Sequence, residues 1–212
     1  AMLDSSVKRR KEIETLTSIP VYGELPRKPR KLKNQEIVVN LEEPSELSEC
    51  FPLLAERMVA LSDGNGGNPL SVLITSTCSG EGKTYLSVNL ALSLAVAGKK
   101  VLLMDMDLRK GALSALLGGA GKPGLGDLEQ AGEGGWRSLV EQSPVSDHLD
   151  YLFAGTVPDH PSRLLLHDRI RKLMEEVKEQ YDFIFMDCVP YSSLADARIV
   201  ARLADVTLYV MR

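Results

Sequence analysis

The sequence has few cysteines, no paired histidines and no long hydrophobic run. Cys50, Cys78 and Cys188 are an odd number at irregular spacings among 212 residues, which fits neither a disulfide framework nor a Cys-x-x-Cys metal site. No two of the three histidines have the i, i+4 spacing of a helical zinc site. The best apolar stretch, 90–97, is far shorter than the roughly 18 residues that cross a bilayer. We therefore expect a soluble globular fragment from a reducing cytoplasm.

Positive charge is scarce beyond residue 33. Residues 1–33 hold nine Lys or Arg against four Asp or Glu, a net charge of +5, and the whole chain carries −4, so the remainder carries −9. A basic segment on an acidic domain is typical of attraction to nucleic acid or to an anionic membrane surface, and a solvated linker can have the same composition. Four prolines within residues 1–44 predict a largely extended arm or linker there.

Residues 45–212 alternate short apolar runs with longer amphipathic ones, the pattern of βαβ units. The pattern predicts strands at 71–76, 100–105, 149–154, 182–187 and 206–211, and helices at 83–97, 161–180 and 194–203. A helix at 45–62, started or kinked by Pro52, precedes them, and the glycine-rich stretch 111–142 predicts short helices. The fold class is α/β, a doubly wound, mostly parallel sheet with helices on both faces. Because the chain stops on a predicted strand, we expect the natural domain to continue beyond Arg212.

A phosphate-binding loop is predicted where the strand 71–76 runs into a helix. Glycines there allow backbone N–H groups to turn around an anion, Lys83 is expected to bridge the β- and γ-phosphates of ATP, and the Thr84 hydroxyl to ligate Mg²⁺. Thr77 stands where the strict motif has its first glycine, so a polar turn that caps the helix is the alternative. The predicted nucleotide-binding residues here are Ser79, Gly80, Glu81, Gly82, Lys83, Thr84 and Tyr85.

Three aspartates follow apolar strands and fit the same site. Asp105 and Asp107 end one strand, so we expect one to hold Mg²⁺ and the other to accept a proton from an attacking hydroxyl. Asp187 ends another strand and suits a Walker B role in metal binding. Arg109 is close enough in sequence to reach a phosphate or an acidic partner, with an exposed salt bridge as the alternative. The predicted metal ligands are Thr84, Asp105 and Asp187; a solvated loop or helix capping are the alternatives for the aspartates.

Several segments together resemble the cytoplasmic domain of bacterial tyrosine kinases (BY-kinases) that accompany capsule and exopolysaccharide export. They are spread over nearly the whole chain, at 4–26, 75–111, 149–165, 181–190 and 204–212. The resemblance implies a P-loop NTPase fold, ATP and Mg²⁺, and tyrosine autophosphorylation with Lys83, Asp105, Asp107 and Asp187 at motif positions. It also implies a homo-oligomer, protein tyrosine substrates, no nucleic acid, and a membrane-embedded co-polymerase region on the same chain or a separate activator. The domain is then expected at the cytoplasmic face of the bacterial inner membrane, beside its basic arm.

The chain also departs from the family pattern. The family's oligomerisation helix carries Glu-x-x-Arg-x-x-Arg, and the stretch that begins at Glu49 has Pro52 and Ala55 at the arginine positions. The Walker B strand is followed by Cys188-Val189-Pro190 in place of Thr-Pro-Pro, and the six tyrosines are scattered. Two alternatives to an autokinase therefore remain: a nucleotide-binding adaptor without efficient kinase activity, and a ParA/MinD-like ATPase. Cys78 argues against the ParA/MinD-like ATPase, because those ATPases carry an extra lysine at this position.

Overall fold

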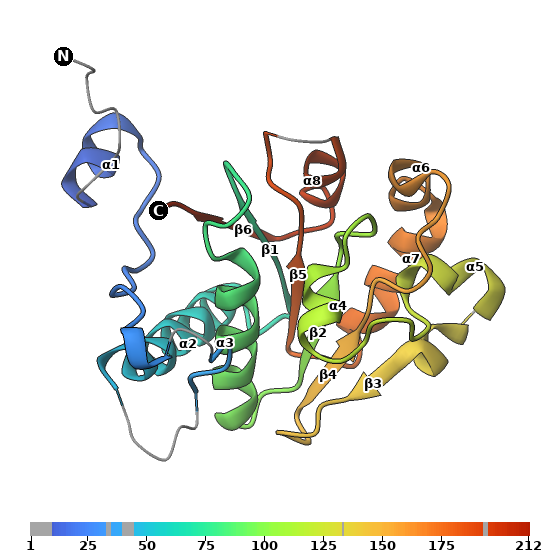
Figure 1. The fold of residues 1–212 in the computed structure, drawn as a ribbon, viewed down its shortest axis with the longest axis horizontal. Helices are drawn as coiled ribbons and strands as arrows, with labels where there is room; N and C mark the ends of the chain where they lie inside the picture. Colours follow the sequence, from blue (N-terminus) through green and yellow to red (C-terminus); the bar gives the residue numbers. More distant parts are fainter. Residues whose placement is uncertain (1–9, 33–34, 40–44, 133, 193–194) are drawn as a thin grey trace.

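The computed structural model describes residues 10–32, 35–39, 45–132, 134–192 and 195–212 (Figure 1). In this part of the chain one six-stranded sheet has the order β3-β4-β2-β5-β1-β6, and all neighbouring pairs are parallel except β3 with β4. The strands are β1 Leu70–Ser76, β2 Val101–Asp105, β3 Val140–Gln142, β4 Leu149–Leu152, β5 Phe183–Asp187 and β6 Val206–Val210.

Helices cover both faces of the sheet, as predicted (Figure 1). The α-helices are α1 Arg10–Leu16, α2 Glu46–Gly64, α3 Lys83–Val96, α4 Ala112–Leu116, α5 Leu128–Ala131, α6 Pro161–Leu165, α7 Asp168–Lys178 and α8 Ala195–Val200. Short 3₁₀ helices are η1 Arg30–Leu32, η2 Leu125–Asp127 and η3 Gly135–Leu139. None of the helices in the described residues combines the length and hydrophobicity needed to span a bilayer.

The central strands β2 and β5 are apolar up to their last residue because both of their faces are buried. In β2, Val101 and Leu103 pack with α2 and α3, whereas Leu102 and Met104 face α7 and α8 on the other side. This is the packing expected of a parallel sheet, whose strands form continuous hydrophobic runs that end where polar ligands bind. Asp105 and Asp187 are the last residues of two such runs.

Helix α2 begins at a capping box. The Ser45 side chain accepts a hydrogen bond from Ser48 N, and the Ser48 side chain accepts one from Ser45 N. The helix buries Phe51 and Met58 against the core and continues past the exposed Pro52, so the proline neither starts nor ends it. The helix predicted at 45–62 is therefore present, with the bounds Glu46–Gly64.

Three features differ from the predicted elements. The segment predicted as one helix at 161–180 is two, α6 and α7, because His167 is extended and caps α7 by accepting from Arg169 N. The glycine-rich stretch contains the edge strand β3 as well as short helices. The predicted arm is helical in α1 and η1, and its residues 36–39 are bound to α3 through Asn89. Lys8, Arg9 and Lys33 of the basic arm lie outside the described residues.

Candidate functional site: a phosphate loop beside two buried carboxylates

The loop between β1 and α3 has the backbone of an anion cradle. Gly80 and Gly82 have φ angles of 86° and 101°, a left-handed conformation that side chains with a Cβ adopt rarely. Gly82 caps the N-terminus of the 14-residue helix α3, so the positive end of that helix faces the loop. The Glu81 carboxylate accepts a hydrogen bond from Cys78 N at 2.7 Å and braces the turn. The loop is thus shaped for a bound phosphate.

Lys83 places its ammonium group over this loop. Its side chain is buried, and Nζ donates hydrogen bonds to Ser76 Oγ at 2.9 Å and Cys78 O at 3.4 Å. A buried ammonium whose hydrogen bonds go to neutral oxygens is only partly compensated for its lost hydration. An anionic phosphate in the loop would complete that compensation.

Asp187 ends β5 directly behind the first turn of α3. Its two oxygens accept hydrogen bonds from Thr84 Oγ1 at 2.7 Å and Ser87 Oγ at 2.9 Å. The pKa of Asp187 is raised to about 7, mainly by burial. The nearby Asp105 also raises this pKa, whereas the hydrogen bonds from the two hydroxyls lower it. The structure therefore joins the predicted metal ligands Thr84 and Asp187 in one hydrogen-bonded group.

Asp105 lies at the matching position of the neighbouring strand. Asp105 and Asp187 are register partners between β2 and β5. The Asp105 carboxylate is fully buried and accepts from Ser114 N at 2.8 Å, Ser114 Oγ at 2.7 Å and Asp107 N at 3.1 Å. Burial raises its pKa to about 6 against the effect of these donors. Two adjacent buried carboxylates with raised pKa values favour a cation between them and the phosphate loop.

Asp107 and Arg109 occupy the turn that follows β2. The prediction that Asp105 and Asp107 both end one strand is wrong for Asp107, because β2 ends at Asp105. Asp107 is half-buried, and its Oδ1 accepts from the backbone N–H of Arg109 and of Lys110 at 3.2 and 3.1 Å. The Arg109 side chain has an acidic partner within the chain, Asp196, at 2.9 Å.

Tyr85 turns its side chain away from the loop. Its ring meets Phe51 of α2 edge to face at 5.8 Å, and Lys28 Nζ lies 4.7 Å from its centroid. Burial raises the pKa of its hydroxyl to about 12. Only the backbone of Tyr85 continues the phosphate loop.

Three serines of the site were not predicted from the sequence. Ser76 holds the Lys83 ammonium, Ser87 holds Asp187, and Ser114 holds Asp105. Ser87 follows Thr84 by three residues, so helical spacing places both hydroxyls on one face of α3 and is a signal for its role. Ser114 carries no comparable local signal, because its partner lies nine residues away across a turn.

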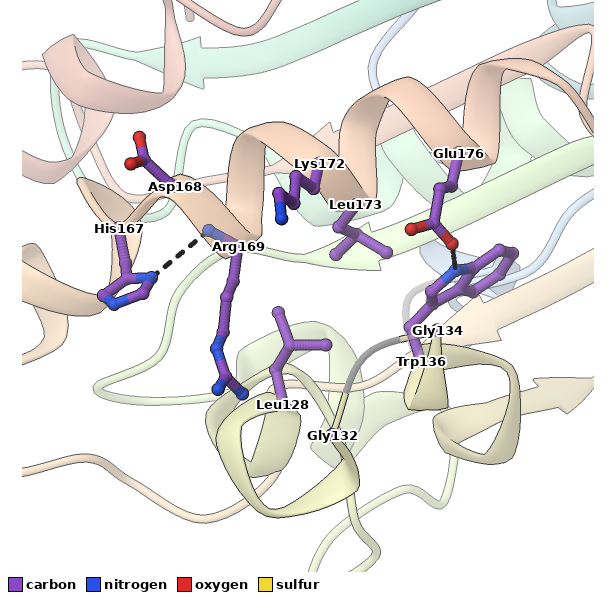
Figure 2. A pocket seen from close by; sticks show the side chains of 10 residues that line it. All are labelled: Leu128, Gly132, Gly134, Trp136, His167, Asp168, Arg169, Lys172, Leu173 and Glu176. Atoms are coloured by element: carbon purple, nitrogen blue, oxygen red, sulfur yellow. Dashed lines mark hydrogen bonds between the residues drawn. The ribbon is translucent and has the colours of Figure 1, made fainter.

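A cavity of about 350 Å³ lies away from this site, between α7 and the segment that contains α5 and η3 (Figure 2). Trp136 forms one wall and donates from Nε1 to Glu176 at 2.6 Å. The cavity is lined by none of the residues predicted for nucleotide or metal binding. The chemistry predicted from the sequence is thus assembled at the carboxyl edge of β1, β2 and β5.

Comparisons with known proteins agree with this geometry. A family model described as the CobQ/CobB/MinD/ParA nucleotide binding domain matches residues 72–199. Tyrosine-protein kinase YwqD of Bacillus subtilis is 33% identical over 189 residues, which cover 87% of this chain and 77% of YwqD. Among solved structures, the BceF tyrosine kinase domain has a TM-score of 0.83 and 30% sequence identity, with 98% of this chain and 87% of that chain covered.

Some relatives are much longer than this chain. Putative tyrosine-protein kinase EpsB of Ralstonia solanacearum is 40% identical over 148 residues, which cover 70% of this chain and 19% of EpsB. The chain therefore spans about a fifth of the length of that relative.

Proposed function

The chain belongs to the bacterial tyrosine-protein kinases, within the CobQ/CobB/MinD/ParA nucleotide-binding domains, and from this premise we propose that it transfers the γ-phosphoryl group of Mg-ATP to a tyrosine hydroxyl. The observation that carries the proposal is the pair of buried carboxylates, Asp105 and Asp187, beside the loop that holds Lys83. Phosphoryl transfer needs positioned phosphates, a divalent cation and an acceptor for the hydroxyl proton, and this site contains candidates for all three.

The residues present fit a magnesium nucleotide. Mg²⁺ in nucleotide sites is bound through one or two carboxylates or hydroxyls together with phosphate oxygens and water. Thr84 and Asp187 already share a hydrogen bond, and Asp105 is the register partner of Asp187. No group of three or more His, Cys, Asp or Glu suited to a metal occurs in the described part of the chain, so the phosphates would supply the missing ligands. When bound, Mg²⁺ neutralises charge that develops on the phosphoryl oxygens.

We assign the loop backbone from Ser79 to Thr84, with Tyr85 N beyond it, to the phosphates, and Lys83 to the bridge between the β- and γ-phosphates. Asp105 and Asp187 would hold the metal because both are buried at the loop. Asp107 is more accessible than Asp105 and would accept the tyrosine proton. As the tyrosine oxygen bonds to the γ-phosphorus, the bond between that phosphorus and the ADP oxygen breaks.

The cellular setting belongs to the same proposal. We propose that the domain works at the cytoplasmic face of the bacterial inner membrane, in polysaccharide synthesis and export, with a membrane-embedded co-polymerase region as its partner. Its substrates would be protein tyrosines, including those of neighbouring copies in a homo-oligomer. Where the family's oligomerisation helix has arginines, Pro52 is exposed and Ala55 is buried in α2, so copies would associate through other contacts.

The proposal is tested by mixing the protein with Mg-ATP and a Glu-Tyr copolymer and measuring phosphotyrosine by mass spectrometry. The matched control is Lys83→Met, which removes the ammonium and keeps an apolar side chain of similar length. We expect phosphotyrosine with the wild type and almost none with the variant. Tight nucleotide binding without phosphotyrosine, on the copolymer or on the full-length protein, would refute the kinase function and favour the adaptor.

A further inference from the structure

A buried carboxylate, Asp196, joins the loops that follow three neighbouring strands. It accepts a hydrogen bond from Arg109 Nε at 2.9 Å on one oxygen and from Ser162 Oγ on the other. Arg109 also donates to Ser162 Oγ at 3.3 Å, so the three side chains form a closed triangle. The Asp196 side chain is only 3% exposed, against 39% for Arg109.

Each member comes from a different part of the sequence. Arg109 lies in the turn after β2, Ser162 in α6 after β4, and Asp196 in α8 after β5. Because the sheet order is β4-β2-β5, these three strands lie side by side, and α6 and α8 meet at the same edge (Figure 1). The triangle therefore connects the segments beyond the carboxyl ends of β4, β2 and β5.

Burial distinguishes this cluster from an ordinary surface ion pair. Exposed pairs contribute little because water screens them. A buried carboxylate needs its partners, since a charge left unpaired in the interior is strongly unfavourable. Asp196 thus holds the Arg109 side chain in one place, and the planar guanidinium, which donates to both members, fixes its orientation as well.

The position of Arg109 bears directly on Asp107. The backbone N–H groups of Arg109 and Lys110 donate to Asp107 Oδ1, so the turn that Arg109 anchors is the turn that orients this carboxylate. Catalytic groups displaced by about 1 Å can lose about a hundredfold in rate. An anchor on this turn can therefore affect catalysis without touching the nucleotide.

We propose that Asp196, with Ser162, is a positioning residue that acts through Arg109 to hold the Asp107 turn in place for phosphoryl transfer. The inference rests on the proposed kinase function for its effect on rate. Its structural part, the anchoring of residues 106–110, stands apart from that function.

The test compares Asp196→Asn with Asp205→Asn. Asp205 is a control because it also binds one cation and one serine, Lys178 and Ser71, but it is partly exposed and lies at the amino-terminal edge of the sheet. We expect Asp196→Asn to lower kcat about tenfold while the KM for ATP changes by less than about twofold. Asp205→Asn should leave both values near those of the wild type.

Two further measurements separate positioning from general damage. Amide hydrogen exchange in residues 106–110 should quicken in Asp196→Asn and not in Asp205→Asn, a readout that requires no activity. The double variant Arg109→Ala with Asp196→Asn should lose no more kcat than Arg109→Ala does, because the two residues act as a unit.

The possible results are distinguishable. If the wild type forms no phosphotyrosine, the kinase proposal fails, and exchange at 106–110 still decides whether Asp196 anchors the turn. Unchanged exchange there in Asp196→Asn, or a loss of kcat equal to that of Asp205→Asn, would overturn the inference.

Discussion

Replacing Asp187 by asparagine should stabilise the nucleotide-free protein at pH 8 while it abolishes phosphotransfer. In the folded protein, burial raises the pKa of Asp187 from 3.8 to about 7. Each pKa unit corresponds to about 1.4 kcal/mol, so an ionised Asp187 lowers the free energy of unfolding by about 4 kcal/mol. Asparagine has nearly the same shape and carries no charge to bury.

The sign and the pH window follow from the two pKa values. Above pH 7 the carboxyl is ionised in both states, and the full penalty is present. At pH 5 it is protonated in the folded protein and ionised in the unfolded one, so the penalty is less than half as large, and it vanishes below pH 3.8. The advantage of Asp187→Asn should therefore grow by roughly 2–3 kcal/mol from pH 5 to pH 8. The pKa of about 7 already includes the preference of the Thr84 and Ser87 hydrogen bonds for the ionised carboxylate.

The assay is urea unfolding of wild type and variant at pH 5 and pH 8, without magnesium or nucleotide. The chain has a single tryptophan, Trp136, which is buried and reports unfolding by fluorescence. Asp205→Asn serves as a control, because its effect on the free energy of unfolding should have the opposite sign. Although burial alone would raise the pKa of Asp205, hydrogen bonds from Lys178 and Ser71 hold it below its usual value. That variant should be destabilised at pH 8, and less so as the pH falls through the folded pKa.

A difference between wild type and Asp187→Asn that is the same at both pH values would contradict the argument. So would a variant that is less stable than the wild type at pH 8. Either result would mean that Asp187 is not held as a destabilised anion that awaits a cation.

Three further predictions concern other parts of the chain. Lys83→Met should lower phosphotransfer at least about a hundredfold, measured as phosphotyrosine formed per minute, because an ammonium aimed at the phosphates is lost. Asn89→Ala removes the side chain that is hydrogen-bonded to residues 36–39, so the free energy of unfolding in urea should fall by roughly 2–4 kcal/mol. Trypsin should also cleave the arm faster. An unchanged urea midpoint would mean that Asn89 does not anchor the arm. Gly124→Ala should destabilise by roughly 2 kcal/mol, because the added methyl would lie 2.2 Å from a backbone oxygen, whereas Gly64→Ala, with open space around it, should not.

The parts of the site that follow a strand closely were predictable from the sequence. A buried parallel strand reads as an apolar run, and its end is marked by the first charged residue, which is how Asp105 and Asp187 were found. The phosphate loop was recognisable because its two glycines, Lys83 and Thr84 lie close together in the sequence, where a strand runs into a helix. These are local signals, and the structure places all of them at one edge of the sheet.

Contacts between distant segments were not predictable in the same way. Arg109 and Asp196 are 87 residues apart, and Asn89 reaches Val38 across 51 residues, so no local pattern pairs them. Which way Tyr85 turns depends on Phe51 of α2, which packs against it only in the folded chain. The break between α6 and α7 was hidden because apolar residues continue through it, and only the extended backbone of His167 reveals it.

The most direct test of the kinase proposal follows the γ-phosphoryl group of ATP itself. The full-length protein would be incubated with magnesium and ATP labelled with ¹⁸O in its γ-phosphate, and the label traced by tandem mass spectrometry. We expect label on tyrosine side chains of the wild type and none on those of Lys83→Met. Label recovered only in inorganic phosphate would contradict the kinase proposal and identify a ParA/MinD-like ATPase instead.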